Sequence, residues 1–164
     1  MAKILRGHLT PTKTLPISAL EWITLMNKLY LIRGASGAGK SSVVESLVEM
    51  AGGTSDIVGG VASLSADDWM VKGGEYEYNK NKQFIVHKIC IDQTEKKMKF
   101  HCGHIFVHNT FTTSSELRPC YKSAKEYNYD VHSVVVENRH DGKNVHDVSE
   151  ESLASQKKRF QVKL

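Results

Sequence analysis

The sequence predicts an α/β fold: a three-layer sandwich in which helices flank a mostly parallel central sheet. Two observations carry this prediction. Short apolar segments rich in β-forming residues alternate with longer segments of helical spacing along most of the chain. Strands that alternate with helices form parallel sheets that are covered on both faces. The length of 164 residues is sufficient to bury the core of one such domain.

Four short apolar segments are the predicted strands. The first, KLYLIR, is followed directly by a glycine, which marks the end of a buried strand. The others share its short, apolar character. The four expected strands cover residues 28–33, 61–65, 104–109 and 131–137.

Helices are predicted between and after the strands, because apolar residues recur there at the spacing of one helix face. The expected ranges are 41–50, 81–100, 114–127 and 149–160. We expect the third helix to be interrupted near Pro119 and the last to begin at Ser149 as its cap. In the helix over 81–100, the side chains expected to face the core are Phe84, Ile85, Ile89 and Met98.

Composition narrows the class of protein. No segment approaches the roughly 18 consecutive apolar residues of a membrane span, so no membrane partner is expected. The three cysteines are odd in number and far apart, which argues against a disulfide framework and favours a cytoplasmic protein. A net charge of +4 suits a polyanionic partner without requiring one. Residues 1–27 lie outside the alternation, and we expect them to form an N-terminal extension before a domain over 28–164.

The segment GASGAGKS, residues 34–41, matches the pattern G-x-x-x-x-G-K-[ST] between a predicted strand and a predicted helix. In such a loop the backbone N–H groups wrap around phosphates, and the helix presents its positive end to the same anion. Lys40 would reach the β- and γ-phosphates of ATP, and the Ser41 hydroxyl would ligate Mg²⁺. The plainer alternative is a glycine-rich turn with a solvated lysine. The residues expected to bind the nucleotide are Gly34, Ala35, Ser36, Gly37, Ala38, Gly39, Lys40, Ser41 and Ser42.

Two adjacent carboxylates, Asp67 and Asp68, follow the second predicted strand. Ligands of open α/β folds bind at the carboxyl ends of the strands, so a carboxylate there can accept a proton from an attacking hydroxyl or hold the metal. Aspartates are also favoured in the first turn of a helix, where they cap backbone N–H groups. The residues alone leave both interpretations open.

Several further segments occur in an order that resembles the small P-loop kinases related to polynucleotide 5′-hydroxyl kinases, including their phage members. After the phosphate loop come ADDW, GEYEYN, the stretch from FVHNTF to EYNYDV, and NVHDVSEESLASQKKRF. The similarity extends over about residues 29–160. It implies the fold of a P-loop NTPase, ATP and Mg²⁺ as cofactors, and a 5′-hydroxyl nucleic-acid end as partner.

The same resemblance assigns roles to particular residues. It implies that Asp67 is the general base for a hydroxyl nucleophile and that Lys40 and Ser41 hold ATP and Mg²⁺. A lid over about residues 138–148 would supply an arginine to the transferring phosphoryl group, with Arg139 as first candidate and Lys143 as second. Such a positive charge is expected physically, because phosphoryl transfer depends mostly on positioning and charge neutralisation.

The chain also departs from the family pattern. Met70 stands where phage members carry an arginine that contacts the acceptor. The third strand ends in VHNT rather than in an acid followed by Asn-Thr, so His108 or Asn109 replaces a carboxylate of the magnesium shell. Asp67 or Asp68 would then assist the metal, and we expect Asp68 to ligate it together with Ser41.

Three functions follow from these patterns. The first is an ATP-dependent kinase that transfers the γ-phosphate to the 5′-hydroxyl of a polynucleotide; Tyr76 and Tyr78, interleaved with lysines, could contact such a strand. The second is a kinase of a small hydroxyl acceptor, such as a nucleoside, a nucleotide or a metabolite. The third is a nucleotide-binding regulatory protein with little turnover.

Overall fold

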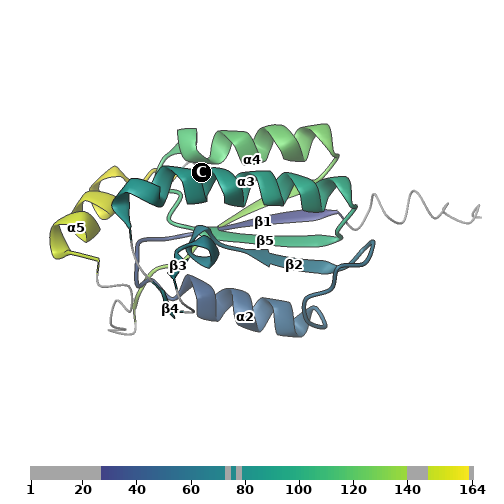
Figure 1. Cartoon of the computed structure of the whole chain (residues 1–164), viewed down its shortest axis with the longest axis horizontal. Coiled ribbons are helices and arrows are strands. Elements are labelled where there is room, and N and C mark those ends of the chain that lie inside the picture. The colour runs from purple at the N-terminus through teal and green to yellow at the C-terminus, as the bar shows by residue number, and fades with distance from the viewer. Residues whose placement is uncertain (1–26, 73–74, 77–78, 140–147, 163–164) are drawn as a thin grey trace, which may run out of the picture.

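The computed structural model describes residues 27–72, 75–76, 79–139 and 148–162 (Figure 1). Nearly all of the expected N-terminal extension, and residues 140–147 of the expected lid, therefore lie outside the described residues. Both remain predictions.

Four strands form one parallel sheet: β1 (Lys28–Arg33), β2 (Val61–Leu64), β5 (His104–Asn109) and β6 (Asp130–Val135). Their order is β2-β5-β1-β6, so β1 is an inner strand with a partner on each side. Leu29, Leu31 and Ile32 of this strand are completely buried. The predicted strands are thus confirmed to within about two residues.

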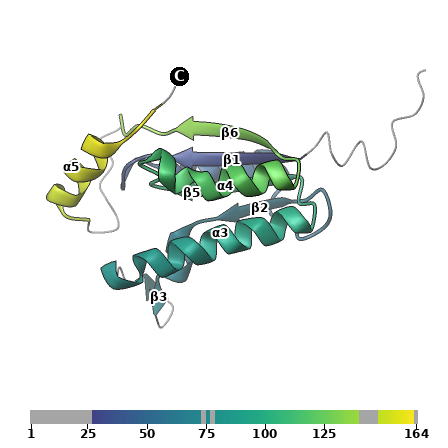
Figure 2. The same ribbon diagram turned by 90° about the horizontal axis from the view of Figure 1, so that it is seen from above.

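Helices cover both faces of this sheet. In Figure 1, α2 (Lys40–Met50) lies on one face, and α3 (Gln83–Lys99) and α4 (Ser114–Glu126) lie on the other. Seen from above, α3 and α4 run side by side, and α5 (Glu150–Arg159) lies at the end toward which β1 and β6 point (Figure 2). This arrangement confirms the predicted three-layer sandwich.

Short elements connect β2 to α3. A 3₁₀ turn, η1 (Ala66–Trp69), precedes a two-stranded antiparallel sheet of β3 (Val71–Lys72) and β4 (Glu75–Tyr76), and a second 3₁₀ turn, η2 (Lys80–Lys82), leads into α3. Tyr78 lies outside the described residues, and of Tyr76 only the backbone is described. The predicted contact of these tyrosines with a nucleic acid stays a prediction.

The buried face of α3 differs from the expected one. Its buried residues recur every fourth position and are Val86, Cys90, Thr94 and Met98. Thr94 is accommodated because its hydroxyl donates to the Cys90 carbonyl at 2.8 Å. Phe84 and Ile85, which were expected in the core, are 81% and 56% exposed. They lie in the first turn of α3, which extends past the sheet toward α5 (Figure 1).

The expected interruption at Pro119 is wrong, because α4 continues through it. A proline inside a helix removes one backbone hydrogen bond and costs about 3 kcal/mol. Here the burial of Leu117 before the proline and of Cys120, Ser123 and Ala124 after it holds the helix against the core.

All three cysteines are buried and have free thiols, as the sequence predicts. Within the described part of the chain, no helix combines the length and the apolar character needed to cross a membrane.

Candidate active site

The phosphate loop connects β1 to α2, as the motif predicts. Gly39 has a φ of 85° and forms the N-cap of α2 in the left-handed region, which disfavours residues with a side chain. Gly34 is required by close approach, since a Cβ there would lie 2.5 Å from the Val136 carbonyl oxygen. Ser41 and Ser42 are exposed in the first turn of α2. The loop therefore presents the N-terminal end of α2 at the carboxyl edge of the sheet.

Lys40 folds back over this loop. Its Nζ donates to the carbonyl oxygens of Gly34, at 3.1 Å, and Ala35, at 2.9 Å. Burial lowers the pKa of Lys40 to about 8, while nearby Asp67 acts in the opposite direction. The ammonium group is held within the loop, where it can exchange its carbonyl partners for phosphate oxygens.

Asp67 and Asp68 lie in η1, directly after β2. Ser65 caps this turn: its Oγ accepts from the Asp67 N–H at 3.2 Å, and Asp68 Oδ2 accepts from the Ser65 N–H at 2.8 Å. Capping thus accounts for one oxygen of Asp68, which is exposed, whereas Asp67 is half-buried. Asp68 thus has the capping role that was one of the two interpretations of the sequence, and the role of Asp67 as a base stays a prediction.

His108 and Asn109, at the end of β5, have different surroundings. The Asn109 amide is buried, and its Oδ1 accepts from the Ala66 N–H at 2.8 Å, which ties η1 to the sheet. His108 Nε2 lies 3.2 Å from Ser63 Oγ on the adjacent strand. Burial lowers the pKa of His108, which favours the neutral imidazole, although Asp68 acts to raise it. An imidazole therefore stands at the position expected of a carboxylate.

The sequence also singled out Arg139, Lys143 and Met70. Arg139 is exposed, and its guanidinium donates to Glu137 Oε2 from Nε, at 2.9 Å, and from Nη2, at 2.6 Å. Lys143 lies outside the described residues. Met70 is buried in the main core.

Sequence reasoning missed the contacts that hold α5 against the phosphate loop. Gln156 Oε1 accepts from the Ser36 N–H at 2.9 Å, and Gln156 Nε2 donates to Ser36 Oγ at 3.1 Å. Arg33 is buried at the end of β1 and donates from Nη2 to the carbonyls of Phe111, at 2.8 Å, and Gln161, at 2.7 Å. The sequence did contain one signal for such contacts, because an arginine at the end of a buried strand needs hydrogen-bond acceptors from other segments.

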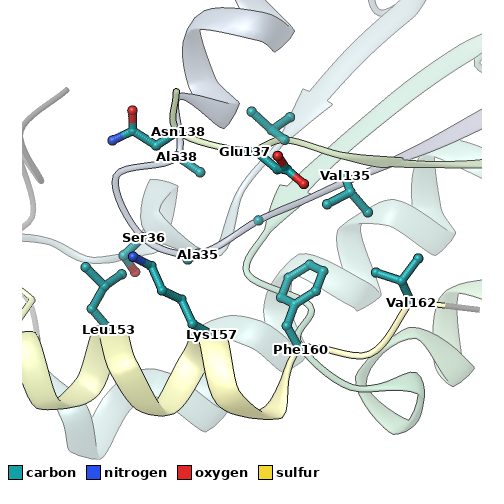
Figure 3. Close-up of a pocket in the computed structure, with 12 residues that line it drawn as sticks. Ala35, Ser36, Ala38, Val135, Glu137, Asn138, Leu153, Lys157, Phe160 and Val162 are labelled. Atoms are coloured by element: carbon teal, nitrogen blue, oxygen red, sulfur yellow. The ribbon is translucent and has the colours of Figure 1, made fainter. Parts of the chain in front are cut away.

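Among the described residues, two cavities lie beside this region. The smaller, of about 330 Å³, lies between the phosphate loop, the end of β6 and α5 (Figure 3). Leu153, Phe160 and Val162 give it apolar walls, and the Lys157 side chain extends from α5 toward Ser36. The larger, of about 780 Å³, lies between the first turns of α3 and α4, the segment after β5, and Arg159.

The donor groups at the loop fit magnesium bound through phosphates. Mg²⁺ prefers oxygen ligands and commonly takes one or two from the protein and the rest from phosphates and water. The Ser41 hydroxyl and the aspartates of η1 are ligands of this kind. Among the described residues, no group of three or more His, Cys, Asp or Glu side chains could form a metal cage of its own.

The sequence matches no protein-family model and no curated protein. Solved structures resemble the fold. A gluconokinase from Sinorhizobium meliloti 1021 aligns with a TM-score of 0.56 at 14% identity, over 84% of this chain and 77% of that one. Kti12 from Chaetomium thermophilum, in complex with ADP-AlF3, aligns with a TM-score of 0.52 at 10% identity, over 82% and 80%.

A chain of the Pnkp1/Rnl/Hen1 RNA repair complex also aligns, with a TM-score of 0.53 at 16% identity. The match covers 82% of this protein but only 46% of that chain. This protein has the fold of the P-loop kinases. At these identities the likeness concerns the fold alone, and the substrates must be inferred from the site.

Proposed function

We propose that the protein is an ATP-dependent phosphotransferase that moves the γ-phosphate of ATP to the 5′-hydroxyl of a polynucleotide. The observation that carries this proposal is the arrangement of Lys40, held by two carbonyls of the phosphate loop at the start of α2, and the half-buried Asp67, which directly follows β2, a strand that α2 contacts. A phosphate-binding cation and a carboxylate base are the two groups that such a transfer requires.

In the proposed reaction, Asp67 accepts the proton of the acceptor hydroxyl as its oxygen forms a bond to the γ-phosphorus. The bond between that phosphorus and the oxygen of the β-phosphate breaks, and ADP leaves. Lys40 and the N–H groups of the loop stabilise the negative charge on the phosphates. Mg²⁺ bound with ATP would neutralise further charge, with Ser41 and Asp68 as the residues to hold it. Arg139, in the proposed lid over about 138–148, is the candidate to stabilise the negative charge on the phosphoryl group during transfer.

The smaller cavity supports a place for the nucleotide base. It adjoins Gly34, Ala35 and Ser36 of the loop, and its apolar walls suit a flat aromatic ring. The base would then lie beside α5, and the phosphates would lie along the loop.

A small hydroxyl compound is the second candidate acceptor. Met70 is buried where an acceptor-binding arginine was expected, and the cavity of about 780 Å³ has the size of a small-molecule site. Both observations also suit a kinase of a nucleoside, a nucleotide or a metabolite, which would need no long basic groove.

The deciding experiment offers γ-labelled ATP and Mg²⁺ with 5′-hydroxyl DNA and RNA oligonucleotides, and in parallel with nucleosides. The wild-type protein should label the oligonucleotide, and Asp67→Asn should lose the activity while still binding ATP. Asp92→Asn, the same change on the exposed surface of α3, is the matched control and should keep it. Label on nucleosides alone would establish the second acceptor class, and full activity of Asp67→Asn would contradict the assigned base.

A further inference from the structure

The larger cavity is lined by an aromatic side chain that the described residues leave mostly exposed. Phe84 lines the cavity from the first turn of α3 and is 81% exposed. Phe111 and Pro119 line it as well, from the segment after β5 and from α4. The exposed ring of Phe84 is therefore available to a ligand that enters the cavity.

This cavity is connected to the proposed reaction centre. Thr110, which lines it, accepts a backbone hydrogen bond from Gly34 of the phosphate loop at 3.3 Å. α3, whose first turns line the cavity, also packs against η1, the turn that carries Asp67. The cavity therefore adjoins both a segment bonded to the phosphate loop and the helix that contacts the turn of the proposed base.

The polar groups of one wall already bond to one another. Glu116 accepts from the Thr112 N–H, at 2.8 Å, and from its hydroxyl, at 3.2 Å. Arg159 Nε donates to that same hydroxyl at 2.9 Å. The ring of Phe84 and the exposed Lys88, one helical turn apart on α3, are among the groups that a ligand in the cavity could meet. A flat ring beside a cation suits a base with an attached phosphate, the arrangement of single-stranded nucleic acids.

We infer that this cavity receives the first nucleoside of the acceptor strand, with its base stacked on Phe84 and the following phosphate beside Lys88. The inference rests on the proposed function and names the part of the strand that the protein holds. Because stacking is accepted by every base, the protein should show little preference for the identity of the terminal base.

The test uses a 5′-hydroxyl oligonucleotide whose first base is the fluorescent analogue 2-aminopurine, which is quenched when it stacks. Wild type should quench the probe on binding. Phe84→Ala should abolish the quenching and weaken binding roughly tenfold to a hundredfold. Phe84→Tyr should restore both. Phe100→Ala is the matched control, because Phe100 is 72% exposed near the other end of α3.

Three measurements separate this inference from the proposed function: binding of the oligonucleotide probe, binding of ATP, and phosphate transfer. If Phe84→Ala binds and quenches the probe as wild type does, the assigned cavity is wrong even where phosphate transfer is observed. If wild type binds ATP but no oligonucleotide, the inference is wrong and a small acceptor is favoured. If no acceptor is phosphorylated at all, the proposed function itself fails.

Discussion

The affinity for ATP should depend on the protonation of Lys40. In the free protein, burial lowers the pKa of Lys40 to about 8. Bound phosphates stabilise the charged ammonium and so raise this pKa again. Since the nucleotide binds the protonated form more tightly, affinity must fall as the pH rises above the pKa of the free protein.

The magnitude follows from the two protonation states. At pH 7 about nine-tenths of the lysine is charged, and at pH 9 about one-tenth is, so the dissociation constant for ATP should rise about tenfold. This corresponds to about 1.4 kcal/mol. The nucleotide phosphates have their last pKa near 6 and stay ionised throughout this range.

Titration of ATP into the protein by calorimetry at pH 7, 8 and 9 measures the effect. Lys40→Arg keeps its charge over this range, so its affinity, although lower at pH 7, should not change with pH. Lys157→Met alters a lysine that extends toward Ser36 from α5 and should keep the wild-type pH dependence. A wild-type affinity that is constant from pH 7 to 9, or an equal decrease in Lys40→Arg, would refute the assignment.

Three further predictions concern residues around the loop. Arg139→Ala should leave the free energy of unfolding within about 1 kcal/mol of wild type, because the ion pair of Arg139 with Glu137 is exposed. If Arg139 acts on the phosphoryl group, the rate of phosphate transfer from labelled ATP should fall about a thousandfold or more in this variant. Arg33→Met leaves the carbonyls of Phe111 and Gln161 without their donor, so urea denaturation should show a loss of about 2–4 kcal/mol. His108→Asp places a carboxylate near the loop, and nucleotide binding should then reach half-saturation at a several-fold lower Mg²⁺ concentration.

Local features of the chain explain what sequence reasoning predicted well. The phosphate loop is specified by glycines at fixed spacing. Gly34 stands where a side chain would collide with the Val136 carbonyl, and Gly39 stands where φ is positive. The helix start at Ser149 is equally local, since its hydroxyl accepts from the Ser152 N–H three residues on. Alternating strands and helices sufficed for the parallel sheet, because each periodicity reports which face of an element is buried.

Side-chain partners were harder to predict where they come from distant segments. Phe84 and Ile85 are apolar like core residues, but α3 extends past the sheet at that point, and the described residues leave both side chains mostly exposed. Whether an apolar side chain is buried depends on where its helix ends relative to the sheet, and sequence spacing does not contain that position.

By itself, the sequence determined the fold class, the phosphate loop and the position of Asp67 after the second strand. Only the tertiary structure decided which groups surround them. Gln156 meets Ser36 across 120 residues, and Arg33 meets Gln161 across 128. A motif predicts the backbone conformation of a few consecutive residues, because the φ and ψ preferences that it encodes are local. Which distant side chain completes a hydrogen bond depends on how whole elements pack, and that packing is a property of the entire core.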